Sequence, residues 1–198
     1  MYSVVVWLTA EGYPGPGHNR LAGVVRGQQQ LTFEFAEVRL WELDAEEKLA
    51  WIEAEGRWSL LPLVPLMGEE PRPEVLERAV EGAGKVGEAQ ERADVYTGIA
   101  VLGGLRYGGD LIRRLIREEV LMESPIYREI LERGAIRAKR EAILEVLAAR
   151  FGVVPKEVAG EIGQVEDGEE LGRLVRMAAR CRSWEEFAAE LPTAAVGT

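Results

Sequence analysis

Residues 2–8 read Tyr-Ser-Val-Val-Val-Trp-Leu, a run of β-branched and aromatic side chains in which apolar and polar positions hardly alternate. Such a run is typical of a strand that is covered on both faces. A strand of this kind also needs neighbours along its edges. Two interpretations stay open: the strand pairs with later strands of this chain, or the chain is the rear part of a longer fold.

A loop and further strands follow this run. Residues 11–17 contain two prolines and three glycines, which exclude the interior of a helix or strand. Residues 21–26 and 30–40 then have the composition and alternation of two or three strands, with Gly27 at the turn between them. We therefore expect a small β-sheet within about the first 43 residues.

Helical patterns fill the rest of the chain. Asp44 and Glu47 have the spacing of a capping box and begin a helix that runs to about Ala54. Residues 59–67 include Pro62 and Pro65, and we expect an extended, buried connector there. The later helices are expected over residues 73–82, 87–106, 110–122 and 125–151, the last interrupted near Gly134, and from Pro155, Asp167 and Ser183 onwards.

These elements predict an α+β fold, with a small N-terminal β-sheet followed by a mainly α-helical C-terminal region. Three segments are expected from the shifts in composition. Residues 1–108 form an α+β region, residues 109–151 form a helical connector suited to self-association, and residues 152–198 form a small helical C-terminal domain.

The composition excludes several classes of protein. The chain has 198 residues, a formal charge of −10, one histidine and one cysteine, so an internal disulfide, a His/Cys metal cage and a Ser/His/Asp triad with a choice of histidines are poorly supported. No apolar run reaches the length of about 18 residues that a membrane span requires, and we expect a cytoplasmic protein. The acidic balance disfavours a wholly nucleic-acid-binding surface, and only residues 109–150 are net positive, by one charge.

Carboxylates are the main remaining candidates for chemistry. A nuclease site places an Asp and a Glu-X-Lys or Glu-X-Gln around a hard cation. Glu46-Glu-Lys48 superficially has this form, but the first turn of a helix explains it better. Glu34 and Glu37, with Asp44, are the other candidate set, and we favour a solvent-facing role for the two glutamates.

Two isolated residues carry reactive side chains. His18, beside Asn19 and Arg20, lies in the glycine-proline loop and is a candidate for binding an anion or substrate. Cys181 lies between Arg180 and Arg182, whose charges lower a thiol pKa when they are close. Neither residue has an identified catalytic partner, so we favour an incidental loop position for His18 and a packing role for Cys181.

Two sets of side chains on the helices suggest surfaces for binding. Basic residues that could contact a nucleic-acid backbone are interleaved with glutamates, which favours an ordinary solvated face: Arg113, Arg114, Arg117, Arg137, Lys139 and Arg140. An amphipathic stripe either packs internally or pairs with a second copy: Ile136, Ile143, Leu144, Leu147 and Phe151.

Several stretches, taken in order, resemble the rear half of the recombination-promoting nuclease and transposase family, which has a PD-(D/E)XK nuclease core. They are residues 2–15, the Phe-Glu-Phe-Ala-Glu-Val-Arg-Leu-Trp-Glu-Leu of residues 33–43, and residues 60–67, 92–107 and 111–131. Residues 142–191 are similar to a small helical domain of unknown function found at the C-terminus of such proteins. The resemblance covers almost the whole chain, and none of its motifs is catalytic.

The resemblance implies that the family's catalytic strand pair, with its metal-binding Asp and Glu-X-Gln or Glu-X-Lys, belongs upstream of Tyr2. No residue of this chain is then assigned a catalytic, cofactor-binding or metal-binding role, and Mg²⁺ is implied only for the full-length family. The leading hypothesis is a non-catalytic C-terminal part of a nuclease/transposase-like protein linked to DNA recombination, serving as a scaffold or in oligomerisation.

Two alternatives remain. One is a standalone protein-binding or dimerisation module, and the other is an active Mg²⁺-dependent DNA endonuclease with an unorthodox site built from Glu34, Glu37 and Asp44. The expected partners are a second copy or a separate chain that supplies the front half. DNA is weakly supported as a partner, and a membrane is not expected.

Overall fold

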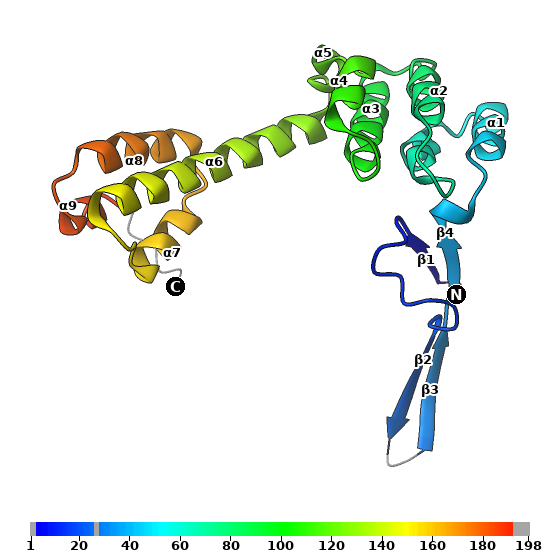
Figure 1. Cartoon of the computed structure of the whole chain (residues 1–198), viewed down its shortest axis with the longest axis horizontal. Helices are drawn as coiled ribbons and strands as arrows, with labels where there is room; N and C mark the ends of the chain where they lie inside the picture. The colour runs from blue at the N-terminus through cyan, green and yellow to red at the C-terminus, as the bar shows by residue number, and fades with distance from the viewer. Residues whose placement is uncertain (1–2, 26–27, 192–198) are drawn as a thin grey trace. The chain divides into compact units, whose positions relative to one another are not determined.

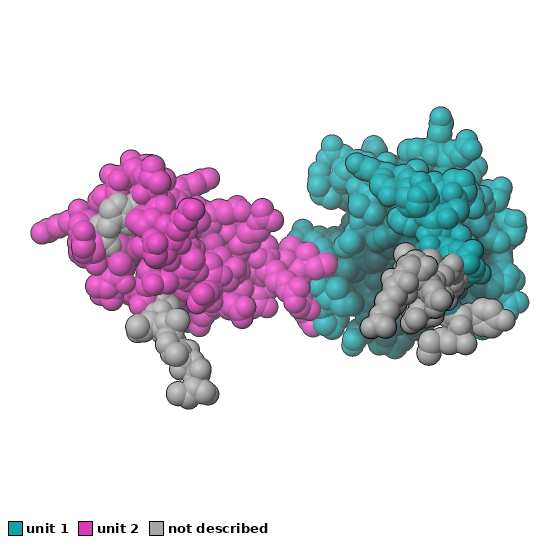
Figure 2. Space-filling model, turned by 90° about the horizontal axis from the view of Figure 1, so that it is seen from below, with its two compact units in different colours: residues 1–127 teal, residues 128–198 magenta. Residues whose placement is uncertain are grey.

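A computed structural model describes residues 3–25 and 28–191, and it is 64% helical with its strands near the N-terminus. The α+β class, mainly helical, is thereby confirmed (Figure 1). The chain forms two compact units, residues 1–127 and 128–198 (Figure 2). The boundary falls inside the segment 109–151 that the composition sets apart.

The strands of unit 1 form two separate two-stranded sheets. β1 (Val4–Trp7) pairs in parallel with β4 (Ala36–Arg39), and β2 (Arg20–Val25) pairs antiparallel with β3 (Gln28–Glu34). Of the two or three strands expected over residues 21–26 and 30–40, the structure has three, because β3 and β4 are separate strands that meet at Phe35, each with a different neighbour. The predicted turn at Gly27, and Tyr2 at the start of the predicted strand, lie outside the described residues.

The parallel pair has two different faces. Its register places Val4 beside Ala36 and Val6 beside Val38, so these four apolar side chains share one face. The other face carries the pairs Val5–Glu37 and Trp7–Arg39. Val4 is 55% exposed and Val6 is 46% exposed, so the expectation that this strand is covered on both faces is wrong for this chain.

The helical layer of unit 1 is built around a segment that contains prolines. η2 (Trp58–Leu66) is a 3₁₀ helix with Pro62 and Pro65 inside it, so the expected extended connector is wrong, although the expected burial of Leu61, Val64 and Leu66 is confirmed. Proline fixes φ near −65°, which suits 3₁₀ geometry. η2 contacts three helices: α1 (Ala45–Glu55), α2 (Pro73–Ala83) and α3 (Ala89–Gly103).

Short elements complete unit 1. η1 (Leu40–Glu42) links β4 to α1, and the expected helix over residues 110–122 is divided into α4 (Gly109–Leu115) and α5 (Glu118–Leu121). Ile116 between them is extended and buried in the unit 1 core. The helix therefore ends where the Ile116 side chain enters the core.

α6 (Pro125–Phe151) begins at the end of unit 1 and continues into unit 2 without the interruption expected near Gly134. Ion pairs at i, i+4 bracket the glycine, Glu129–Arg133 on one side and Arg137–Glu141 on the other, and such pairs support an exposed helix. Ser124 caps the helix, since its Oγ accepts a hydrogen bond from the backbone N–H of Tyr127 at 3.2 Å.

Unit 2 closes with the three short helices predicted from their start signals: α7 (Lys156–Gln164), α8 (Gly168–Arg180) and α9 (Trp184–Ala188). Asp167 and Ser183 cap α8 and α9 through their side chains. Ile143 and Leu147 are fully buried among these helices, with Ile136, Leu144 and Phe151 partly buried around them, so the amphipathic stripe of the sequence packs internally. Among the helices that the structure describes, none is both long and apolar enough to cross a bilayer.

A pair of glycine substitutions tests the contact between η2 and α3. A Cβ on Gly98 would lie 2.7 Å from Cγ of Pro62, and the rigid ring cannot move aside. We expect Gly98→Ala to lower the free energy of unfolding by about 1–3 kcal/mol in urea titrations. In the control, Gly160→Ala in α7, the new Cβ meets no atom within 4 Å, so that variant should gain stability from helix propensity. A Gly98→Ala variant as stable as the control would contradict the close contact.

Candidate functional site

A polar and aromatic cluster covers one face of the parallel strands. Tyr13 reaches this face from the glycine-proline loop, and its hydroxyl donates a hydrogen bond to Oε2 of Glu37 at 3.2 Å. The same hydroxyl accepts a hydrogen bond from Nη1 of Arg39 at 3.3 Å. The Tyr13 hydroxyl therefore links an acidic and a basic side chain that follow each other on one face of β4.

Aromatic rings close the cluster around Tyr13. Trp7 and Trp41 contact the Tyr13 ring edge-on, with centroid separations of 5.2 and 5.5 Å. Nε1 of Trp7 and Oε1 of Glu37 are buried without a hydrogen-bond partner among the described residues. Nε of Arg39 forms no hydrogen bond either, but it lies 3.2 Å from a carboxylate oxygen of Glu42. This face is already filled by the chain's own side chains, so it offers little room for a substrate.

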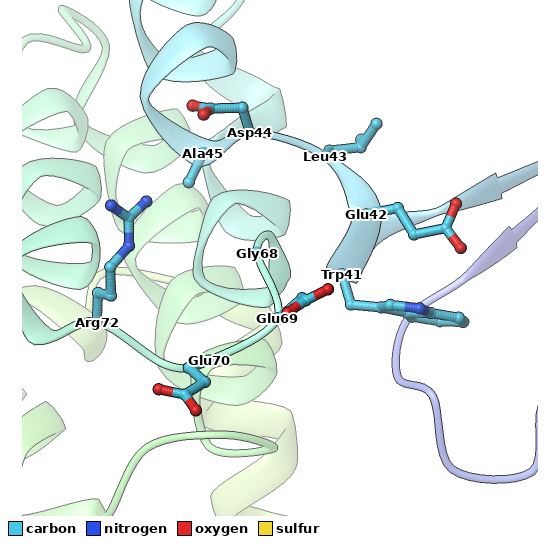
Figure 3. Close-up of a pocket in the computed structure, with 9 residues that line it drawn as sticks. All are labelled: Trp41, Glu42, Leu43, Asp44, Ala45, Gly68, Glu69, Glu70 and Arg72. Atoms are coloured by element: carbon cyan, nitrogen blue, oxygen red, sulfur yellow. The ribbon is translucent and has the colours of Figure 1, made fainter.

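A cavity lies beside the cluster, between residues 41–45 and residues 68–72 (Figure 3). It has a volume of about 650 Å³ and is lined by Trp41, Leu43, Ala45, Gly68, Arg72 and four acidic residues, Glu42, Asp44, Glu69 and Glu70. Figure 3 shows the four carboxylates pointing in different directions instead of toward one point. The described residues contain no group of three or more His, Cys, Asp or Glu side chains that could hold a metal ion.

One wall of this cavity is fixed by the end of α3. The guanidinium of Arg106 donates hydrogen bonds to the backbone carbonyls of four successive residues, 66–69, at 2.6–3.2 Å. Tyr107 donates to the carbonyl of Arg72 and accepts from its N–H, at 3.0 and 3.1 Å. Burial raises the pKa of the Tyr107 hydroxyl, which keeps it neutral and able to donate. The loop that lines the cavity is therefore held in place from both sides.

The three carboxylates proposed as an unorthodox metal site do not converge. Glu34 lies 3.5 Å from Arg20 at the end of the β2–β3 hairpin, and Glu37 binds Tyr13. Asp44 caps α1 by accepting a hydrogen bond from the N–H of Glu47 at 2.9 Å. In the same turn, Glu46 pairs with Arg78 of α2 and Lys48 pairs with Glu47, which is the structural role favoured for this Glu-Glu-Lys motif.

The two isolated candidates, His18 and Cys181, contact only other groups of the chain in the structure. His18 is exposed, and its Nδ1 lies 3.1 Å from the carbonyl of Gly15 in its own loop. Cys181 is 1% exposed and belongs to the unit 2 core, as the packing interpretation expects. The arginine that approaches its sulfur is Arg150, at 3.5 Å, instead of the neighbours in sequence.

The candidate basic side chains between residues 109 and 150 are divided between the two units, and most of them bind other groups of the chain. Arg113 pairs with Asp110, and Arg137 pairs with Glu141. Lys139 and Arg140 donate to the backbone carbonyls of Gly168 and Val165. These basic side chains bind carboxylates and backbone carbonyls of the chain itself. Their contacts therefore add no support for a nucleic-acid surface.

The chain was compared with family models, with curated proteins and with solved structures, and none of them matches it.

Replacement of Arg106 tests whether its hydrogen bonds hold the cavity wall. Lysine has no planar fork of donors, so Arg106→Lys should lower the free energy of unfolding by about 1–3 kcal/mol and speed hydrogen exchange at the amides of residues 67–70 and of Arg72. Arg114→Lys, at an exposed position of α4, should leave both quantities unchanged. Equal exchange rates in the two variants would contradict the structural role of Arg106.

Divalent ions test the unorthodox carboxylate site. Glu34, Glu37 and Asp44 are committed to separate contacts, so we expect Mg²⁺ and Mn²⁺ to leave the melting temperature equal to that in sodium chloride of the same ionic strength. A rise in melting temperature that disappears in Glu37→Gln would support a metal site at these carboxylates.

Proposed function

We propose that the chain is an assembly part of a PD-(D/E)XK nuclease/transposase-like protein that acts in DNA recombination. It contributes a scaffold, and a second polypeptide contributes the catalytic carboxylates. The single observation that carries the proposal is the apolar face of β1 and β4, where Val4, Val6 and Ala36 are exposed beside Val38, which packs partly against the unit 1 core.

Parallel strands are covered on both faces in nearly all proteins, and a two-stranded sheet has little stability of its own. Here one face is filled by Tyr13 and its neighbours, whereas the opposite face presents aliphatic side chains to solvent. Leu8, two residues after Val6, is also exposed. Such a surface favours a protein ligand over a small molecule.

The edges of the pair favour a ligand with extended backbone. β1 and β4 pair with each other, and neither pairs with any other described strand. The outer edge of a strand presents backbone N–H and C=O groups that another strand can pair with. A segment that adds a strand and covers the valines would satisfy both requirements, and the catalytic strand pair implied by the family resemblance has this form.

The carboxylates of this chain also fit a scaffold better than a catalytic centre. Glu37 and Arg39 are tied to Tyr13, and Asp44 holds the start of α1. Withdrawal of Glu37 or Asp44 to bind Mg²⁺ would break contacts that support the sheet or its connection to the helices. A second polypeptide is therefore the better source of the metal ligands.

The experiment uses a polypeptide from the same genome that contains strand patterns with an Asp and a Glu-X-Gln or Glu-X-Lys. Its affinity for the full chain is measured by calorimetry, and Mg²⁺-dependent cleavage of DNA is measured for each protein and for the mixture. We expect binding, with cleavage by the mixture only. Val6→Asp should weaken binding about tenfold or more, because it buries a charge in the interface.

Val153→Asp is the matched control, since Val153 is 93% exposed in unit 2 and the substitution adds the same charge. Circular dichroism should show that both variants remain folded. DNA cleavage by the purified chain alone, lost in Glu37→Gln, would overturn the proposal, and so would an equal loss of binding in the control.

A further inference from the structure

The C-terminal part of α8 carries a concentration of positive charge. Residues 171–182 contain four arginines and no acidic residue, in a chain whose formal charge is −10. Three of these arginines, Arg173, Arg176 and Arg180, line an open hollow of about 220 Å³ together with Met177. We call these three arginines the arginine face. An acidic protein thus presents one basic surface on a single helix of unit 2.

The arginine face lies on the outer side of α8. The other side of the helix carries Leu171, Leu174 and Ala178, which are buried in the unit 2 core. At 3.6 residues per turn, Arg180 is roughly 160° around the helix from Ala178. Arg176 and Arg180 are both exposed, so the face is open to a ligand from solvent.

Two of the three guanidinium groups have no acidic partner. Arg173 is held by Glu170 and Glu190, whose carboxylate oxygens each lie 2.7 Å from it. Arg176 and Arg180 form no ion pair with any residue that the structure describes. Like charges at i, i+4 destabilise a helix, and an anion bound beside both arginines would offset this repulsion.

The end of the helix does not account for these arginines. Basic side chains near a helix C-terminus often bind the last backbone carbonyls. In α8 this contact comes from α6, since Nη1 of Arg150 donates a hydrogen bond to the carbonyl of Ala178 at 2.6 Å. Among the described residues, neither Arg176 nor Arg180 donates to a carbonyl, so both guanidinium groups are available to a ligand.

The shape of the hollow favours a polymer that carries several phosphates. All its lining residues belong to one helix, so it cannot enclose a small molecule, which normally loses most of its surface to a pocket. A guanidinium group binds phosphate through two N–H donors. Arg176 and Arg180 lie roughly 6 Å apart along the helix axis, so they can reach neighbouring phosphates of one strand.

The buried side of α8 favours a nucleic acid over a lipid surface. A helix that binds a membrane inserts its apolar face among the lipids. The apolar face of α8 is already packed in the unit 2 core, so the helix has none to insert. A nucleic-acid backbone requires only exposed positive charge.

We propose that the arginine face binds the phosphate backbone of DNA, with Arg176 and Arg180 as the residues that contact phosphate. Contacts to phosphates carry no sequence information, so the binding has no sequence preference. The choice of DNA rests on the proposed function. The contacts themselves are independent of the surface on β1 and β4.

Fluorescence anisotropy on the full chain tests the binding, with a labelled DNA duplex of about 20 base pairs in about 50 mM sodium chloride. We expect Arg176→Gln combined with Arg180→Gln to weaken binding about tenfold or more and to lower the slope of log Kd against log salt by roughly two. Arg176→Lys combined with Arg180→Lys keeps both charges and should retain most of the affinity. A native chain that does not bind, or a double glutamine variant that binds as tightly as the native chain, would overturn the proposal.

Arg133→Gln combined with Arg137→Gln is the matched control. These two arginines are also exposed and one turn apart, but each pairs with a glutamate of α6. The control removes the same charge, and we expect it to leave the salt slope unchanged. Circular dichroism should show that all variants remain folded. Equal losses of affinity in the two double glutamine variants would overturn the proposal, because binding would then follow net charge alone.

Competition separates DNA from other anionic ligands. Vesicles of phosphatidylglycerol and poly-glutamate are each added at the same concentration of charge as unlabelled DNA. We expect only the unlabelled DNA to displace the labelled duplex, and displacement by either of the others would overturn the choice of DNA.

A last pair of measurements separates this proposal from the proposed function. Val6→Asp should leave the affinity for DNA unchanged, and the double glutamine variant of the arginine face should still bind the second polypeptide. Loss of DNA binding in Val6→Asp would contradict the arginine face as the site. Absence of DNA binding in a native chain that binds the second polypeptide would overturn this inference alone.

Discussion

The approach of Pro62 to the backbone of α3 is the constraint on which unit 1 depends. Gly98 has no side chain, so the ring lies against the helix at a distance that any Cβ would block. η2 can then occupy the centre of the layer, where α1, α2 and α3 all contact it. The same helix, α3, leads into Arg106 and Tyr107, which hold the loop after η2 in place. The packing in the core and the cavity wall therefore depend on one another.

Local rules predicted much of this fold. The capping residues Asp44, Asp167 and Ser183 located the starts of their helices, since a side-chain oxygen that satisfies the first N–H groups is a short-range signal. The errors come from long-range effects. The φ of Pro62 and Pro65 suits the 3₁₀ form of η2, but its central position depends on the three helices that contact it, and the break at Ile116 depends on the core that buries it. Neither is visible in a short window of sequence.

The candidate site was harder to predict. Alternation along β4 places Glu37 and Arg39 on one face, and this could have been expected from the strand pattern. Their link through Tyr13 could not, because it depends on how a loop with two prolines folds back over the sheet. Arg106 carries no motif at all, and its role is visible only when the four carbonyls of residues 66–69 are seen together.

Ser124 joins two parts of the chain that the sequence separates. Its side chain is fully buried, and its hydroxyl donates to Asp94 of α3 at 2.6 Å while it caps the first turn of α6. The cap is thus available only while α3 is folded in its place. Melting of α3 would remove the acceptor of the Ser124 hydroxyl, so the first turn of α6 is coupled to the packing of the unit 1 core.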